Sequence, residues 1–246
     1  MFPIRDHNPS GRTPFVTWAL MAANILIFFS YWGEMDNVRY MNAFWYDWSL
    51  IPARVITGDG TYTIISAMFL HGGLMHLAGN MLFLFIFGDN IEDTMGHFGF
   101  LVFYLVCGVL ASVAHIAIEP GSTVPLVGAS GAIAGVMGAY LLLFPRARVD
   151  ILLILIVIFR VFPIPAWIML LLWFGMQFVG GIGAGAEAGG VAYWAHAGGF
   201  VAGVIGAVPI WLRLGGPAFW RRTHGEPPHP EAHYTVTSRV PRIKRR

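Results

Sequence analysis

Six apolar stretches constrain the fold of this chain more than any other feature, because most of them are long enough to cross a lipid bilayer. They are Pro14–Trp32, Leu74–Gly88, Phe98–Ala117, Gly128–Phe144, Ile164–Ile182 and Val191–Leu212. Only 11% of the 246 residues are charged, whereas about a quarter is usual in a soluble domain. The stretches lack the alternation of a membrane β-strand, and a helix satisfies its own backbone hydrogen bonds in lipid. The sequence therefore predicts an all-α membrane protein, a six-transmembrane-helix bundle.

The positive charges predict how the spans are oriented. If the N-terminus is cytoplasmic, 13 of the 15 Lys and Arg side chains fall on the cytoplasmic side, and only Arg39 and Arg54 fall outside. Cytoplasmic loops of membrane proteins carry an excess of Lys and Arg. We therefore expect a multi-pass protein of the cell (inner) membrane with the N- and C-termini both cytoplasmic.

The segments outside the spans divide the chain into three parts. We expect residues 1–13 to be a cytoplasmic N-terminal segment, 14–213 the six-span domain, and 214–246 a disordered basic cytoplasmic tail, because the last part is rich in proline and poor in apolar residues. The loop Ser30–Tyr62 is rich in aromatic residues and is expected at the membrane interface. The run Ile151–Ile158 is too short to span, so we place it in a membrane-apposed loop.

Ionisable and polar side chains inside spans are rare enough that each is a functional candidate. Here they are His71, His76, Asn80, His115, Ser130, Gln177 and His196. With a rise of about 1.5 Å per residue, Ser130 lies roughly 21 Å above the inner end of its span, His196 roughly 24 Å and His76 roughly 18 Å. Asn80 follows one turn below His76. Four of these groups are therefore predicted at one level, in the outer half of the bilayer.

Small residues predict that the fourth and sixth spans touch. Gly131 and Gly135 lie on one span, and Ala195, Gly199 and Gly203 on the other, in small-xxx-small patterns that let helix backbones approach closely. The short Ser130 side chain needs such an approach to reach a ring nitrogen of His196.

Hydrogen-bond donors are predicted to surround the same serine. His76 and Asn80 share a helix face, and the Ser130 N–H at a helix start has no intrahelical acceptor, so three donors are available for an oxyanion hole. No acidic residue occurs in the outer half of these spans, so a Ser–His dyad is the arrangement available.

Simpler interpretations exist for each group. Ser130 alone would be a helix-contact residue, and His76 with Asn80 a structural hydrogen bond between helices. A metal site from His71, His76 and His196 is disfavoured, because the spacing of five places the first two on different helix faces and no His-Glu-x-x-His motif occurs. We interpret His115, Gln177 and Cys107 as structural. No metal or cofactor is expected.

These motifs resemble those of the rhomboid family of intramembrane serine proteases, in its compact six-span bacterial form. The resemblance lies in His71-xxxx-His76-xxx-Asn80, Gly128-Ala129-Ser130-Gly131 and Ala195-His196-xx-Gly199-xxx-Gly203, in family order, and covers about Pro14–Trp211. It implies Ser130 as nucleophile, His196 as general base, an oxyanion hole of His76, Asn80 and the Ser130 amide, and His71 in support. It implies a gate in the fifth span, which carries Trp167, Trp173 and Phe174.

The resemblance also implies partners. The substrates would be single-span transmembrane proteins, cut in or near their span in the lipid bilayer, without nucleic acid; the oligomeric state is left open. One departure is Ala134, where some members have an aromatic residue that stacks on the histidine. Tyr193, Trp194 or packing alone would then have to orient His196. Two competing functions are a non-catalytic rhomboid-like binder, which would lack the serine or histidine, and a small transporter, which would need mid-span Gly/Pro breaks and an internal repeat.

Overall fold

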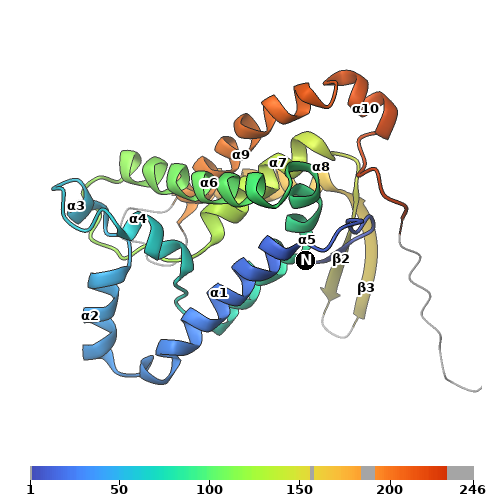
Figure 1. Cartoon of the computed structure of the whole chain (residues 1–246). Coiled ribbons are helices and arrows are strands. Elements are labelled where there is room, and N and C mark those ends of the chain that lie inside the picture. Colours follow the sequence, from blue (N-terminus) through green and yellow to red (C-terminus); the bar gives the residue numbers. More distant parts are fainter. Residues whose placement is uncertain (1, 156–157, 184–191, 232–246) are drawn as a thin grey trace, which may run out of the picture.

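The computed structural model describes residues 2–155, 158–183 and 192–231. Figure 1 shows a helical bundle with irregular segments at one end and a small sheet at the other. Within these residues, five helices are long and apolar enough to cross a membrane: α1 (Phe15–Tyr31, continued by a 3-10 turn to Glu34), α5 (Leu74–Met95), α6 (His97–Ile118), α8 (Ala166–Gly183) and α9 (Tyr193–Arg213). A sixth apolar helix, α7 (Ser130–Leu143), is shorter. The predicted mostly helical membrane bundle is confirmed.

Helix α7 is the centre of the bundle. Gly128, with φ of +128°, bends the chain just before it, and Pro145 follows its C-terminus, where a helix cannot easily continue. Its residues from Gly131 to Tyr140 are all buried by the surrounding helices. A short helix surrounded on all sides sets its first residue, Ser130, below the end of the bundle.

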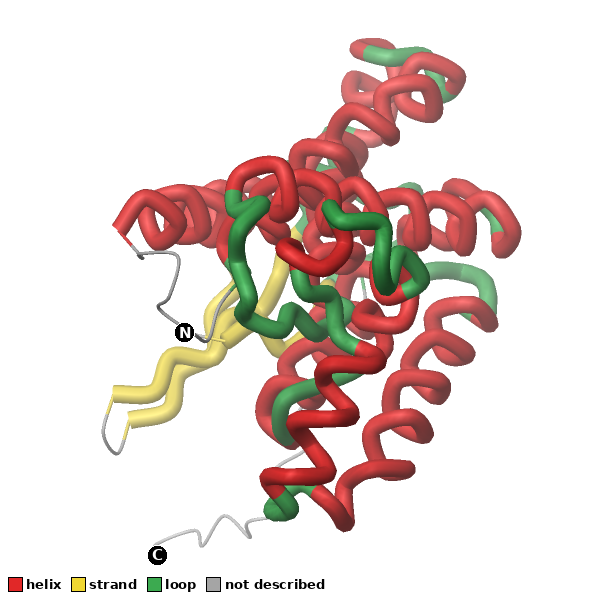
Figure 2. Tube along the Cα trace, turned by 90° about the vertical axis from the view of Figure 1, so that its left-hand side faces the viewer, coloured by secondary structure: helices red, strands yellow, loops and turns green. Residues whose placement is uncertain are grey.

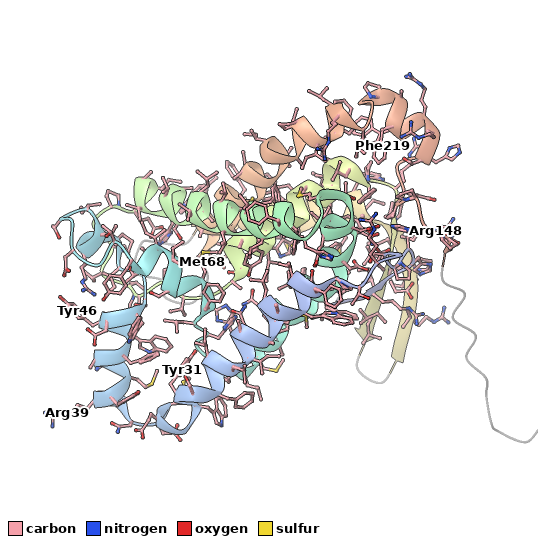
Figure 3. All side chains as sticks on the ribbon, viewed as in Figure 1. Tyr31, Arg39, Tyr46, Met68, Arg148 and Phe219 are labelled. Carbon is pink, nitrogen blue, oxygen red and sulfur yellow. The ribbon has the colours of Figure 1, made fainter. Side chains whose placement is uncertain are left out.

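The aromatic loop after α1 is helical for much of its length. It contains a 3-10 turn (Trp32–Glu34), α2 (Val38–Trp48) and α3 (Pro52–Val55). It is followed by α4 (Thr63–Ser66) and a second 3-10 turn (Ala67–Phe69). The Asn37 side chain caps α2 by accepting a hydrogen bond from the Tyr40 N–H. Figure 3 shows Arg39 and Tyr46 on α2, at the end of the molecule opposite Arg148 and Phe219.

A three-stranded antiparallel sheet lies at the other end, with strand order β1 (Phe2–Asp6), β2 (Arg148–Leu155) and β3 (Ile158–Pro165). The predicted loop at Ile151–Ile158 is therefore wrong: its described residues belong to a hairpin, which projects from the helices in Figure 2. Its β-branched residues favour strands. The N-terminal segment supplies the third strand, with Asp6 opposite Val149, so it is part of the fold.

The second span is longer than the predicted Leu74–Gly88, and part of the predicted disordered tail is ordered. Helix α5 continues to Met95, because Glu92 accepts hydrogen bonds from the Val16 and Thr17 backbone N–H groups and is thereby buried at little cost. The tail forms α10 (Pro217–Thr223), and its Trp220 indole N–H donates to the Leu142 carbonyl. The prediction of disorder is thus wrong for Pro217–Thr223. Residues 232–246 of the predicted tail lie outside the described residues.

Candidate active site

Ser130 is the first residue of α7, and His196 lies in the first turn of α9. The His196 Nε2 and Ser130 Oγ atoms are 2.6 Å apart, within hydrogen-bond distance. The two residues are 66 positions apart in the chain. The structure therefore brings together the serine and the histidine that the sequence placed at one level.

Glycines make this approach feasible. A Cβ atom on Gly199 would overlap the carbonyl oxygen of Gly131, and one on Gly203 would overlap the carbonyl oxygen of Gly135. Gly138 likewise lies against the Phe200 carbonyl. The backbones of α7 and α9 are thus in direct contact, as the small-residue pattern predicts.

His76 and Asn80 lie on α5 beside the serine. The His76 Nδ1 atom is 3.4 Å from the Gly72 N–H, which leaves Nε2 on the side of Gly128 and Ser130. The position that a Cβ on Gly128 would occupy is 2.9 Å from His76 Nε2 and 3.5 Å from Ser130 Oγ. The Asn80 amide nitrogen donates to the His76 carbonyl at 3.1 Å, and its second hydrogen can serve another acceptor.

His71 supports the loop that leads into α5. It is fully buried, and its ring lies edge-on to that of His76 with centroids 5.1 Å apart. The Tyr31 hydroxyl holds its backbone, since it accepts from the His71 N–H at 2.8 Å and donates to the His71 carbonyl at 3.0 Å. In the described part of the chain, no three His, Cys, Asp or Glu residues form a group that could hold a metal ion.

The groups that contact the far side of His196 come from α8. The Gln177 Oε1 atom is 2.8 Å from His196 Nδ1, and the Trp173 ring lies over the imidazole at 5.7 Å with an interplanar angle of 33°. The sequence left Tyr193, Trp194 or packing alone to orient the ring; in the structure Tyr193 packs on Gly180 and Trp194 on Gly181, and the ring contacts come from α8. Ala134 is buried in the core, and the aromatic ring packed on His196 is that of Trp173, from another helix.

Sequence reasoning therefore missed the role of Gln177, although it singled this residue out as a rare polar group in a span. Nothing in the pattern of α8 indicates which side of it faces α9. His115 was also taken as structural, yet it lines the same cavity as the dyad.

The three candidate gate residues differ in position. Trp173 contacts His196, and Phe174 stacks on Phe200 with ring centroids 4.7 Å apart. Trp167 lies almost two turns earlier on α8, where its backbone N–H donates to the Pro145 carbonyl and its side chain is 45% exposed. The structure thus brings Trp173 and Phe174 near the site but not Trp167.

A cavity of about 870 Å³ contains these groups. Its wall includes Ser130, His196, His76, Asn80 and His115, together with residues of the loop after α6, namely Ser122, Val124, Pro125 and Leu126. A hydroxyl, three imidazoles and an amide thus converge on a space large enough for a peptide segment.

Comparison with known proteins is consistent with this geometry. A profile of the rhomboid domain matches residues 59–213. The chain is 30% identical over 196 residues to Rhomboid protein 1, mitochondrial, of Saccharomyces cerevisiae, covering 77% of this chain and 51% of that protein. It is 33% identical over 130 residues to Rhomboid protease GluP of Bacillus subtilis, covering 52% and 24%. The presenilin-associated rhomboid-like protein of Pongo abelii is 30% identical over 135 residues, covering 54% and 34%.

This chain belongs to the rhomboid family. The family is known for intramembrane serine proteases that act on membrane proteins, and this member is a multi-pass membrane protein by its helices. The chain spans about half the length of the yeast relative and smaller shares of the other two.

Proposed function

We propose that this protein is a serine endopeptidase that cleaves single-span membrane proteins in or near their transmembrane segment. The observation that carries the proposal is the 2.6 Å distance between Ser130 Oγ and His196 Nε2 at the wall of a cavity. A serine hydroxyl is a weak nucleophile until an adjacent base accepts its proton. A serine used only for helix packing would not need an imidazole aimed at its oxygen.

In the proposed reaction, the Ser130 hydroxyl donates its proton to His196 Nε2 while Oγ attacks the scissile carbonyl carbon. The resulting imidazolium then protonates the leaving amine, and an acyl-enzyme remains on Ser130. His196 next removes a proton from water, which attacks the ester, and returns that proton to the departing Ser130 Oγ as the new carboxyl terminus is released. Each proton is thus moved by one imidazole, without a third catalytic acid.

The negative oxygen of the tetrahedral intermediate would be stabilised by the Ser130 backbone N–H, His76 Nε2 and the second hydrogen of the Asn80 amide. His76 supports this role, because its Nδ1 lies toward the Gly72 N–H and its Nε2 faces Gly128. His71 would keep the entry to α5 in place. No cofactor is needed for these steps.

The membrane setting follows from the helices. We propose that residues 14–213 form the catalytic domain, that both termini are cytoplasmic, and that the cell (inner) membrane is the site of action. A substrate span would then approach from lipid past α8, with Trp173 and Phe174 at the gate. The cavity wall formed by the loop after α6 would supply water from outside.

The decisive experiment measures cleavage of a fluorogenic transmembrane peptide in liposomes by the full chain and by Ser130→Ala and His196→Ala variants. We expect both variants to lose activity by at least about 10³-fold. Ser112→Ala, which changes a buried serine on α6, is the matched control and should cleave as the unchanged protein does.

The same experiment distinguishes the proposed protease from the competing function, a non-catalytic binder. A non-catalytic binder would retain the substrate peptide without cutting it, and the unchanged protein would then show no product. Equal cleavage by Ser130→Ala and by the unchanged protein would show that the serine assignment is wrong.

A further inference from the structure

Gln177 lies in the interior of α8 and contacts the histidine of the dyad. Its side chain is only 8% exposed. A buried amide in a membrane helix is costly unless its groups are paired. Both of its polar atoms have partners: Oε1 lies 2.8 Å from His196 Nδ1, and Nε2 donates to the Trp173 carbonyl at 3.3 Å. The side chain therefore bridges its own helix and the histidine of α9.

The bridge determines which way the amide faces. A carboxamide can present either its oxygen or its nitrogen to a neighbour. Here the nitrogen is the atom that can donate to a carbonyl, and the Trp173 carbonyl occupies that side. The oxygen must then face His196, and an oxygen can only accept, so Nδ1 is the ring nitrogen that carries the hydrogen.

That hydrogen position matters for the proposed reaction. A neutral imidazole carries one hydrogen, on either Nδ1 or Nε2, and only the nitrogen without it can accept a proton. If Nε2 held the hydrogen, it would donate to Ser130 and could not deprotonate it. Within residues 2–155, 158–183 and 192–231, no second hydrogen bond to His196 Nδ1 is found.

We infer that Gln177 is a positioning residue, which holds His196 in the tautomer with Nδ1 protonated and Nε2 directed at Ser130. This inference rests on the function proposed above. The Trp173 ring, lying over the imidazole, restricts its rotation from the same helix. A neutral amide does this in the membrane interior without the desolvation cost that a buried carboxylate would carry.

The position of α8 is thereby linked to the state of the base. Both contacts on the far side of His196, from Trp173 and from Gln177, come from this one helix. A displacement of α8 away from α9 would separate the Gln177 oxygen from His196 Nδ1. It would also separate the Trp173 ring from the face of the imidazole. The site is then complete only when α8 lies against α9.

The first measurement determines the tautomer in the unchanged protein. The nitrogen chemical shifts of a ¹⁵N-histidine-labelled full chain in detergent distinguish the two tautomers, and the His196 signal is assigned by its loss in His196→Asn. The titratable groups around this ring are His76 on α5, His115 and Glu119 at the end of α6, and Tyr193 on α9. Spectra are therefore recorded at a pH where the His196 signal is that of the neutral ring. We expect the Nδ1–H form, and an Nε2–H form would overturn the inference.

The second measurement compares variants of similar size. Gln177→Met removes the acceptor and should lower kcat by about 10–100-fold, as loss of an outer-shell partner of a functional histidine does, with little change in KM. Gln177→Glu keeps an oxygen at the same place, although it adds the desolvation cost of a carboxylate, and should lose less kcat than Gln177→Met. Met176→Leu changes the neighbouring, 63% exposed side chain and should leave every value unchanged.

The outcomes distinguish this inference from the proposed function. If Ser130→Ala is inactive while Gln177→Met keeps the kcat and tautomer of the unchanged protein, Gln177 has no positioning role although the protease assignment stands. If Gln177→Met and Gln177→Glu lose activity equally, with the Nδ1–H form retained in both, the residue is merely structural. If Gln177→Met fails to fold, the tautomer of the unchanged protein decides.

Discussion

At the scale of single residues, Gly128 occupies the most restricted position of the site. Its φ of +128° is one that L side chains rarely adopt, and a Cβ atom there would lie 2.9 Å from His76 Nε2. The space that this absent side chain leaves is bounded by His76 and by the Ser130 hydroxyl. In the proposed reaction, this space would leave room for the oxyanion beside the His76 donor, next to the attacking Ser130 oxygen.

Asn80→Ala tests this arrangement. Loss of one oxyanion donor lowers kcat by about 10²–10³-fold in the more severe known cases, and we expect a fall of this order without a large change in KM. Steady-state cleavage of a fluorogenic transmembrane peptide in liposomes measures both constants.

Asn24→Ala is the matched control for this variant. Asn24 is also a buried asparagine whose amide donates to the carbonyl four residues earlier, at 2.7 Å, but it lies on α1 away from the cavity. It should affect thermal stability without affecting kcat. Equal effects of the two variants on kcat would assign Asn80 a structural role only.

At the scale of elements, the contact between α7 and α9 determines whether Ser130 and His196 meet. Carbonyl oxygens of Gly131 and Gly135 fill the places where side chains of Gly199 and Gly203 would stand. Any side chain there must push the helices apart, because backbone atoms cannot give way as the end of a flexible side chain can.

Gly199→Val should therefore reduce cleavage by about 10²-fold or more, since a displacement near 1 Å in a catalytic contact has effects of that size. The overlap should also cost about 1–3 kcal/mol of stability. Gly175→Val on α8, where no atom lies within 4 Å of the new Cβ, is the control and should remain active. A folded, fully active Gly199→Val variant would show that close helix approach is not required.

A second contact between distant elements fastens the N-terminal strand β1 to the hairpin. Asp150 on β2 is 2% exposed; Arg5 Nε lies 2.5 Å and His7 Nε2 2.6 Å from its two carboxylate oxygens. Burial alone would raise the pKa of Asp150, but the hydrogen bonds from His7 and Arg5 outweigh it and hold this pKa below its usual value.

This carboxylate makes stability depend on acid pH. An unfolded Asp has a pKa of about 3.9, so the stabilisation is fully present above about pH 4 and is lost as the pH falls through the lower folded value. We expect Asp150→Asn to lower the unfolding free energy near neutral pH by about 1–3 kcal/mol and to remove part of the acid dependence. Thermal unfolding in detergent across this range measures both effects. The exposed Asp36→Asn should keep the pH profile of the unchanged protein.

At the scale of the whole molecule, the two ends of the bundle differ in kind. One end carries the helices of the aromatic loop, with Arg39, and the other carries the sheet, α10 and both the first and the last described residues, as Figures 1 and 3 show. The first and last described segments meet there, since the Asn8 amide donates to the His229 carbonyl. Among the described residues, most Arg side chains belong to segments at this second end, which is the cytoplasmic end in the proposed orientation.

The proposed orientation predicts opposite labelling of two single cysteines in a Cys107→Ala background. Arg39→Cys should react with a membrane-impermeant maleimide in intact cells, whereas Arg148→Cys should react only after the membrane is permeabilised. Cys107 itself is buried, so its removal should not disturb the surface. Labelling of both positions from the same side would show that the orientation is wrong.

The sequence by itself determined the features that depend on local spacing. Apolar length identified the spans, and helix rise placed Ser130, His196, His76 and Asn80 at one level. The glycine patterns of α7 and α9 predicted their contact, because such a pattern is a property of one helix face.

Tertiary structure alone decided the features that require partners far along the chain. Whether Gln177 and Trp173 face His196 depends on how α8 is rotated about its own axis, and the sequence of α8, apolar on every face apart from Gln177, does not name the partner of that face. The run at Ile151 becomes a strand because Pro3, from the other end of the chain, pairs with it and a hairpin supplies its second neighbour. The sequence of one strand does not identify its hydrogen-bond partners, because these belong to another strand elsewhere in the chain.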